Sequence, residues 1–213
     1  MAAVKNKARI PKQKRGIETK EKIIKAAMAL FAETGYHKTN ALEIAARAKV
    51  ATGTFYSYFN NKKELLIEIV RQFYKRTSER VLLNYEPKIQ KNKADNYKEG
   101  EKLVHFMVQA LYLSHTIPPA LHKEFLAMKL LDKEIGEITS AEERNITSYM
   151  ISMMQKYKDF IRIDDFEAAA ILLHSIADEV IHQVRIFGMD IDNKRILKEL
   201  EDMICRYLLQ PAS

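Results

Sequence analysis

Apolar residues near the start of the chain recur at the spacing of an α-helix. Between residues 18 and 34 they follow positions i, i+3, i+4 and i+7, and they are Ile24, Ala27, Met28 and Phe31. This spacing gives a helix one apolar face, and Gly35 follows it as a typical stop. We therefore predict a first helix over about residues 18–34 that packs against the rest of the molecule.

Two capping boxes mark the starts of further helices. Asn40 can cap a second helix while Glu43 closes the N-x-x-E box, and this helix is expected to end near residue 49. Asn61 and Glu64 repeat the pattern and open a long fourth helix that extends to about residue 84.

A third, short helix is expected between these two, from about residue 52 to residue 59. Phe55 and Phe59 stand one turn apart and form its inner face, which leaves Tyr56 and Ser57 pointing outward. Two short helices joined by a turn and flanked by apolar helices are typical of a helix-turn-helix, whose second helix enters the major groove of DNA. The predicted motif occupies about residues 39–59.

The remaining sequence is also predicted to be helical. Apolar positions indicate five more helices, at about residues 101–116, 118–130, 133–157, 164–187 and 192–209. The chain holds 6 Gly and 5 Pro in 213 residues, too few of the turn residues that many short strands need. The predicted fold class is all-α with about nine helices, in which an N-terminal helix-turn-helix domain precedes a C-terminal helical bundle.

Charge is distributed unevenly along the chain. Residues 1–80 hold 18 Lys and Arg against 7 Asp and Glu, whereas residues 81–213 hold 17 against 21. A basic head on a mildly acidic body indicates polyanion binding, although a solvated basic surface would have the same charge. We predict a flexible basic arm at 1–15, a DNA-binding domain at 16–80 and a helical body at 81–213. The arm can follow a phosphate backbone or a minor groove, or only aid solubility.

The outward side of the third helix carries the residue types that read DNA. They are small hydrogen-bonding residues, an aromatic hydroxyl and a glycine that allows close backbone approach: Thr52, Gly53, Thr54, Tyr56 and Ser57. Lys62 and Lys63 stand at the start of the fourth helix, where backbone N–H groups and the helix dipole favour a phosphate.

Three motifs follow one another here: LFAETGY, TNALEIAARAKV and GTFYSYFNNKKEL. They belong to the segment IIKAAMALFAETGYHKTNALEIAARAKVATGTFYSYFNNKKELL, from Ile23 to Leu66. This segment resembles the tetracycline-repressor (TetR) family of transcriptional regulators. The resemblance covers about the first third of the chain, whereas the body is much less diagnostic.

The resemblance implies a bacterial, homodimeric repressor whose third helices read two half-sites of a palindromic operator in double-stranded DNA. It implies contacts to bases from Thr52, Gly53, Thr54 and Tyr56. It implies contacts to phosphates from Asn40, Ala41, Ser57, Tyr58 and Lys62. Transcriptional activation by the same architecture remains an alternative, because it depends on where the operator lies relative to a promoter.

The sequence departs from the family pattern at two positions. Lys49 stands where the family commonly has a Gly in the left-handed conformation, which costs a non-Gly residue about 1 kcal/mol, and Lys49 is then available for a phosphate contact. Ala51 stands where a Ser usually caps the third helix, so we expect the cap to move to Thr52.

A stripe of methionine and aromatic residues in the body can be core or can line a cavity. Such stripes are more often core, but the resemblance implies an effector cavity among these middle helices. The candidate lining residues are His105, Tyr112, His115, Phe125, Tyr149, Met150, Met153 and His174. Because these stripes carry few formal charges, we expect a small apolar or aromatic effector.

The last two helices are amphipathic and can pair with their copies in a second chain as a four-helix bundle. The resemblance places the dimer interface there, and the candidates are Leu173, Ile176, Val180, Val184, Ile196, Leu200, Met203 and Tyr207. Alternatively these helices only close the core of one chain. His174, Asp178 and His182 share a helix face at a spacing compatible with a metal ion, but hydrogen-bonded histidines are commoner, and we expect no metal site.

Several classes of function are disfavoured. The chain has one cysteine, no apolar leader, no apolar stretch of membrane-spanning length and no nucleotide-binding or nucleophile motif. We therefore expect a cytoplasmic protein without a cofactor, a membrane partner or an enzymatic activity. A helical enzyme and a nonspecific nucleic-acid-binding module remain the alternatives.

Overall fold

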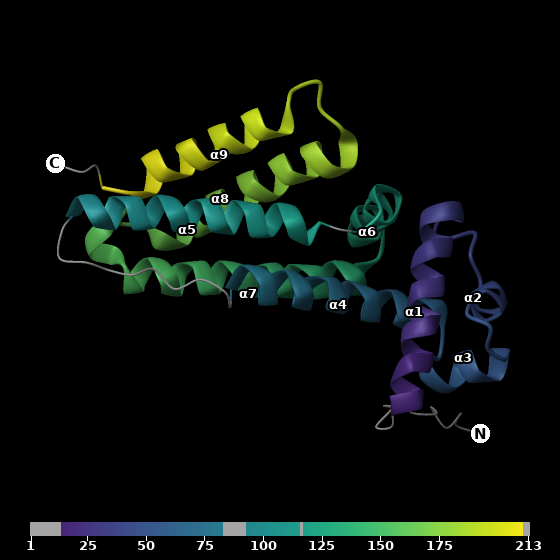
Figure 1. Cartoon of the computed structure of the whole chain (residues 1–213). Helices are drawn as coiled ribbons and strands as arrows, with labels where there is room; N and C mark the ends of the chain where they lie inside the picture. The colour runs from purple at the N-terminus through teal and green to yellow at the C-terminus, as the bar shows by residue number, and fades with distance from the viewer. Residues whose placement is uncertain (1–13, 83–92, 116, 211–213) are drawn as a thin grey trace. The chain divides into compact units, whose positions relative to one another are not determined.

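The protein is described by a computed structural model, which covers residues 14–82, 93–115 and 117–210 (Figure 1). Those residues form nine α-helices and no strand, so the all-α fold class is confirmed. The helices are α1 Lys14–Thr34, α2 Ala41–Arg47, α3 Thr52–Tyr58, α4 Lys62–Leu82, α5 Lys93–Ser114, α6 Pro119–Leu131, α7 Lys133–Lys156, α8 Phe166–His182 and α9 Asn193–Leu208. A 3₁₀ turn at Lys158–Phe160 precedes α8, and a π-helical turn at Gln183–Phe187 extends it.

The chain divides into two compact units. The first unit contains residues 1–73 and 117–138, and the second unit contains residues 74–116 and 139–213. This division differs from the one drawn from the sequence because α6 joins the N-terminal unit. The predicted arm at 1–15 lies largely outside the described residues.

The first unit is built around aromatic and aliphatic side chains. Phe31 of α1, Ile44 of α2 and Phe55 of α3 are fully or almost fully buried, as the helical spacing of the sequence predicts. α6 packs against α1 and contributes the buried Leu121 and Phe125. The apolar positions of the helix-turn-helix segment therefore close their core with a helix that comes much later in the sequence.

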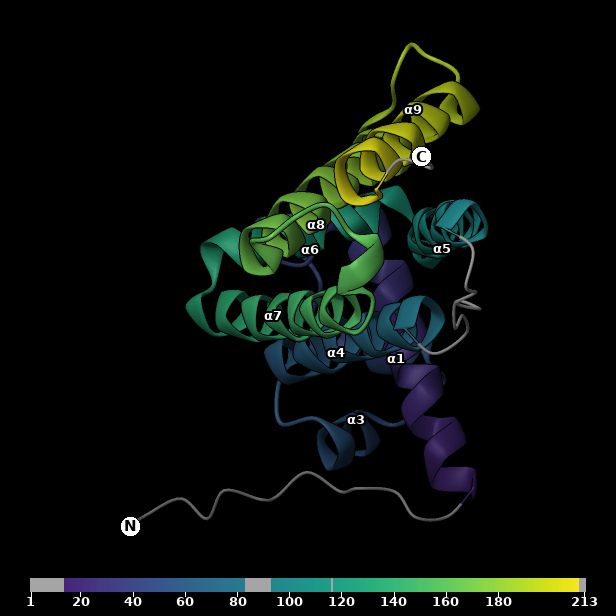
Figure 2. The ribbon, with the colours of Figure 1, turned by 90° about the vertical axis from the view of Figure 1, so that its left-hand side faces the viewer.

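The second unit is centred on α5, α8 and α9, which pack against one another (Figure 2). Their core includes Val104, Leu173 and Leu200. Gly100 on α5 lies close to Leu209, since a Cβ atom on Gly100 would stand 2.7 Å from a terminal methyl of that leucine. A side chain at position 100 would therefore require Leu209 to move.

Three helix boundaries differ from the sequence prediction. α5 begins at Lys93, about eight residues earlier than expected, because the segment contains polar residues typical of a loop, two of which, Asn96 and Glu99, are buried in the structure. α1 begins at Lys14 rather than near residue 18. Asp165, not Asp164, caps α8 by accepting from the Ala168 N–H at 3.0 Å.

Candidate nucleic-acid interface and effector cavity

The helix-turn-helix begins with the predicted capping box. The Glu43 N–H donates to the Asn40 side chain at 3.0 Å, and the Asn40 N–H donates to the Glu43 carboxylate at 3.0 Å. Lys49 then turns the chain with φ 56°, so this lysine occupies the left-handed conformation for which the family usually has a glycine. α2 and α3 are thus connected at a cost of about 1 kcal/mol to the backbone.

The expected shift of the α3 cap to Thr52 is wrong. Ala51 is the N-cap residue and Thr52 is the first residue of the helix. The Ala51 carbonyl accepts from the N–H groups of Thr54 and Phe55, and no side chain caps the helix. The register of α3 therefore follows from the Lys49 turn and from the burial of Phe55 and not from a side-chain cap.

α3 presents one face to solvent. The Tyr56 side chain is 52% exposed, and its ring meets that of Phe55 edge-on at 5.3 Å. Ser57 is exposed and donates to the Thr54 carbonyl at 2.7 Å. A Cβ atom on Gly53 would have no neighbour within 4 Å. The outward direction predicted for Tyr56 and Ser57 is confirmed, and the surface around Gly53 is open.

The other predicted DNA contacts fall into two groups. Asn40 and Lys49 are exposed, and Ala41, Thr52 and Thr54 are partly exposed. Tyr58, by contrast, is only 7% exposed, and its ring forms part of the core of the first unit. Little of the Tyr58 side chain is therefore available for the predicted phosphate contact.

Lys62 holds the loop between α1 and α2. Its Nζ donates to the carbonyl oxygens of Tyr36 and Thr39 at 2.6 and 2.7 Å and lies 4.2 Å from the centre of the Tyr36 ring. Burial lowers the pKa of Lys62, against a smaller opposing effect of Glu43. The geometry therefore assigns Lys62 to closing the motif, whereas the sequence assigned it to a phosphate.

Lys63 is also engaged within the first unit. Its Nζ lies 2.8 Å from Asp132 and 2.9 Å from Glu134, and hydrogen bonds to these two carboxylates raise the pKa of Lys63. These acids stand where α6 ends and α7 begins, so Lys63 ties α4 to that junction.

Two residues that support the motif were missed by the sequence analysis. Thr39 is 2% exposed and donates to the Gly35 carbonyl at 2.9 Å. Glu124 on α6 accepts from the Tyr36 N–H at 2.8 Å. Thr39 adjoins the capping residue Asn40 and could have been noticed, but Glu124 is 88 positions from Tyr36 and no local pattern connects the two.

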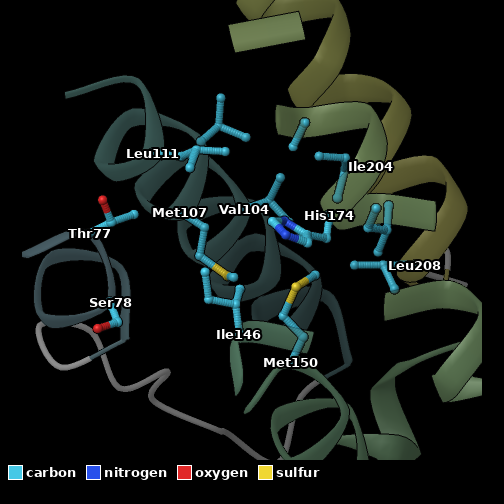
Figure 3. A pocket seen from close by; sticks show the side chains of 13 residues that line it. Thr77, Ser78, Val104, Met107, Leu111, Ile146, Met150, His174, Ile204 and Leu208 are labelled. Atoms are coloured by element: carbon cyan, nitrogen blue, oxygen red, sulfur yellow. The ribbon is translucent and has the colours of Figure 1, made fainter. Parts of the chain in front are cut away.

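The second unit contains two apolar cavities of about 100 Å³ each, and Figure 3 shows the first of them. The first is lined by Thr77, Ser78, Val104, Met107, Val108, Leu111, Ile146, Met150, Leu173, His174, Ala177, Ile204 and Leu208. The second is lined by Asn96, Gly100, Leu103, Val104, Met107, Met150, Met153, Met154, Tyr157, Phe160, Ile161, Leu208 and Leu209. Both include Val104, Met107, Met150 and Leu208, so the two cavities adjoin each other.

Three of the eight predicted effector residues line these cavities, namely Met150, Met153 and His174. The other five do not, and they are His105, Tyr112, His115, Phe125 and Tyr149. Phe125 is in the core of the first unit, and the exposed His105 hydrogen-bonds Glu201 at 2.9 Å. Much of the wall comes instead from α5, whose nearly all-round apolar pattern was the signal that could have identified it.

α8 and α9 carry an exposed apolar face. It includes three of the predicted dimer residues, Ile176, Met203 and Tyr207, and also Ile171 and Leu172, which were not predicted. Three other predicted residues point inward, because Leu173, Val184 and Leu200 are buried within the second unit. Val180 and Ile196 are partly buried. The spacing identified the two helices but assigned several side chains to the wrong face.

The predicted row of His174, Asp178 and His182 separates in the structure. His174 lines the first cavity, whereas Asp178 lies between His182 and His115, the residue that follows α5. None of the helices described is long and apolar enough to cross a membrane.

Comparison with known proteins identifies relatives of the N-terminal head. The family model described as bacterial regulatory proteins, tetR family, matches residues 23–69. The uncharacterized HTH-type transcriptional regulator YuxN of Bacillus subtilis is 34% identical over 128 residues, which is 60% of this chain and 38% of that protein. The fatty acid metabolism regulator protein of Bacillus subtilis is 46% identical over 50 residues, or 24% of this chain and 26% of the relative. The chain thus spans well under half of either relative.

Solved structures extend the likeness to the whole fold. The SmeT–triclosan complex has a TM-score of 0.66 at 22% identity, covering 90% of this chain and 92% of that one. SmeT is described as the repressor of a multidrug efflux pump of Stenotrophomonas maltophilia. At this identity the likeness shows a shared fold.

Proposed function

We propose that this chain, whose residues 23–69 match the model of the tetR family of bacterial regulatory proteins, is a sequence-specific, DNA-binding transcriptional repressor. The observation that carries the proposal is the exposed face of α3. Tyr56 and Ser57 are exposed there, and the space beside Gly53 is empty. An exposed aromatic hydroxyl beside small polar residues can reach base edges in the major groove. Thr52, Thr54, Asn40, Ala41 and Lys49 complete the proposed DNA-binding set.

The repressor acts as a homodimer through the exposed apolar face of α8 and α9. Two recognition helices that bind the same side of a duplex must lie about 34–36 Å apart, whereas the described residues of one chain form a single helix-turn-helix. Ile171, Leu172, Ile176, Met203 and Tyr207 supply the apolar surface that a second copy would cover. A twofold dimer then reads a palindromic operator.

The effector is a small apolar or aromatic molecule that occupies the two adjoining cavities. Their shared wall of Val104, Met107, Met150 and Leu208 supports an elongated ligand that spans both. The likeness to a structure that holds triclosan, and to a fatty acid metabolism regulator, supports the same class of ligand. Such an effector releases DNA because it binds the DNA-free conformation of the protein more tightly than the DNA-bound conformation.

Regulation, rather than catalysis, is the proposed activity. Enzymes bring a nucleophile, a base and an acid together around the substrate. In the described part of the chain, the cavity walls consist mainly of aliphatic and thioether side chains. The relatives that match are themselves regulators of transcription.

Repression and activation are distinguished by in-vitro transcription from a promoter that carries the operator, and we expect the transcript to decrease.

The first experiment is selection of randomised duplex DNA by the full chain at near-physiological salt. The expected result is a palindrome whose half-sites lie about one helical turn apart. Recovery of no consensus, with retention that disappears as salt rises, would refute sequence-specific binding and leave a nonspecific polyanion binder.

The selected operator then serves to test the effector site. Triclosan and a series of saturated fatty acids are added to the protein–operator complex, and release of DNA is measured by fluorescence anisotropy. Met107→Trp fills the shared wall of both cavities and is expected to abolish release while operator binding persists. Met189→Trp is the matched control, because Met189 is exposed and lines neither cavity. Equal responses of the two variants would refute the proposed effector site.

A further inference from the structure

Two histidines and an aspartate converge beside the C-terminal end of α5. His115 and His182 are 4% and 8% exposed, and their ring centres lie 5.3 Å apart. Asp178, one helical turn before His182 on α8, presents one carboxylate oxygen to each of them. Its Oδ1 lies 3.8 Å from His115 Nε2, and its Oδ2 lies 3.7 Å from His182 Nε2.

His115 and His182 also present ring nitrogens that lie within 4.8 Å of each other. The two distances to Asp178 involve different carboxylate oxygens, and both exceed the usual length of a direct N–H···O hydrogen bond, which is about 2.7–3.2 Å. Two ligands that each bind one zinc ion at about 2.1 Å stand about 3.4 Å apart in a tetrahedral site and somewhat farther apart at wider angles. One ion shared by all three groups requires the Asp178 side chain, which is 32% exposed, to turn so that one of its oxygens faces both histidines.

The tautomer of His115 is set for metal binding. Its Nδ1 lies 2.9 Å from the Leu111 carbonyl oxygen, and because a carbonyl can only accept, Nδ1 carries the proton. In the neutral imidazole the lone pair is then on Nε2, the atom that faces Asp178. A histidine whose other ring nitrogen donates to a backbone carbonyl is the usual arrangement around bound zinc.

The surroundings of the three residues are ordered and include further charge. Arg185 donates to the His115 carbonyl at 3.0 Å, and its guanidinium lies 4.7 Å from the centre of the Tyr112 ring. The Arg185 guanidinium therefore holds the backbone carbonyl of His115 in place.

We propose that His115, Asp178 and His182 form a binding site for a divalent transition-metal ion, with Zn²⁺ as the ion that best fits two imidazoles and a carboxylate. The ion joins the end of α5 to α8 within the second unit. Leu111 and Ala177, which neighbour the site in sequence, line the first cavity. Metal binding therefore stabilises the unit that contains the cavities, and the proposal is independent of the proposed DNA recognition.

The test uses the full chain after removal of metal with a chelator. Zn²⁺ or Co²⁺ is added at near-neutral pH, and bound metal per chain is measured by equilibrium dialysis and elemental analysis. The wild-type chain is expected to bind one ion, to unfold at a higher temperature with metal, and to give Co²⁺ the visible absorption of a site with nitrogen and oxygen ligands. Absence of stoichiometric binding to the wild-type chain refutes the proposal without reference to any variant.

Variants assign the ligands. Asp178→Asn and His182→Gln are each expected to weaken Zn²⁺ binding at least ~10-fold, since even outer-shell changes cost that much in metal sites. His174→Gln is the matched control. It removes another histidine from α8, and the side chain of that histidine lines the first cavity. Circular dichroism without metal verifies that each variant is folded, and Asp178→Asn, which preserves side-chain size, serves where a histidine variant does not fold. Unchanged binding in Asp178→Asn, or an equal loss in His174→Gln, overturns the assignment.

Discussion

Replacing Lys62 by methionine is expected to destabilise the first unit and to leave the salt dependence of DNA binding unchanged. The Lys62 ammonium group donates to the Tyr36 and Thr39 carbonyl oxygens and lies over the Tyr36 ring. Methionine retains most of the apolar stem and removes the charged donor. Both carbonyls of the loop between α1 and α2 then lose their partner.

The magnitude follows from these contacts. A hydrogen bond to a charged group contributes about 1.5–3 kcal/mol to stability. Because Lys62 is partly exposed, water can replace part of the lost bonding, and we expect the free energy of unfolding to fall by about 2 kcal/mol for the pair. In urea unfolding, this decrease in the free energy of unfolding appears as a lower midpoint concentration of urea, with an unchanged dependence (m) of that free energy on urea concentration.

DNA binding provides the second readout. Each phosphate contact that is lost should change the slope of log K against log salt by about 0.9. Lys62→Met should leave that slope unchanged, whereas Lys49→Met, which removes an exposed lysine at the turn before α3, should reduce it by about 0.9. If Lys62→Met instead keeps the wild-type urea midpoint and flattens the salt slope, Lys62 is a phosphate ligand and the reasoning from its hydrogen bonds is wrong.

Three further predictions concern separate parts of the molecule. Tyr56→Ala should weaken binding to the selected operator by about 1–3 kcal/mol, with little effect on unrelated DNA; competition binding measures the ratio, and an equal loss on both would exclude a base contact. Gly100→Ala should destabilise the second unit by about 1 kcal/mol in urea unfolding, because the close contact with Leu209 outweighs the gain in helix propensity; a stabilised variant would contradict the contact. Cys205, the single cysteine, should react slowly with a thiol reagent at neutral pH, because burial, helped by nearby carboxylates, raises its pKa to about 11 and only the thiolate reacts. The rate should rise toward that pH or on unfolding, and fast labelling of the folded chain would disprove the shift.

The helix-turn-helix could be predicted closely because its signals are local. The Asn40–Glu43 box, the helix stop at Gly35 and the inward Phe55 each depend on residues within one or two turns. The same reasoning failed at Ala51, where we expected a side-chain cap and the structure has none. There the register is set by the turn at Lys49 and by burial of Phe55, which a capping rule does not consider.

The helical body at residues 81–213 was predicted less well, because its pattern of apolar residues is compatible with more than one way of packing the helices. Helices that are apolar on most sides do not specify which side meets a neighbour. Leu173 and Leu200 were therefore assigned to an interface and lie in the core, and Phe125 was assigned to the cavity and lies in the first unit. Met150, Met153 and His174 do line the cavities, and their contact with an effector stays a prediction.

The sequence by itself determined the all-α class, most helix positions and the outward face of α3, because helix periodicity, caps and stops act over a few residues. Only the tertiary structure decided that α6 joins the first unit, that Lys62 is bound to the loop between α1 and α2, and that His115 meets Asp178 and His182. These pairings join residues that are far apart in the chain. The packing of whole helices brings them together, and no spacing within one segment encodes that packing.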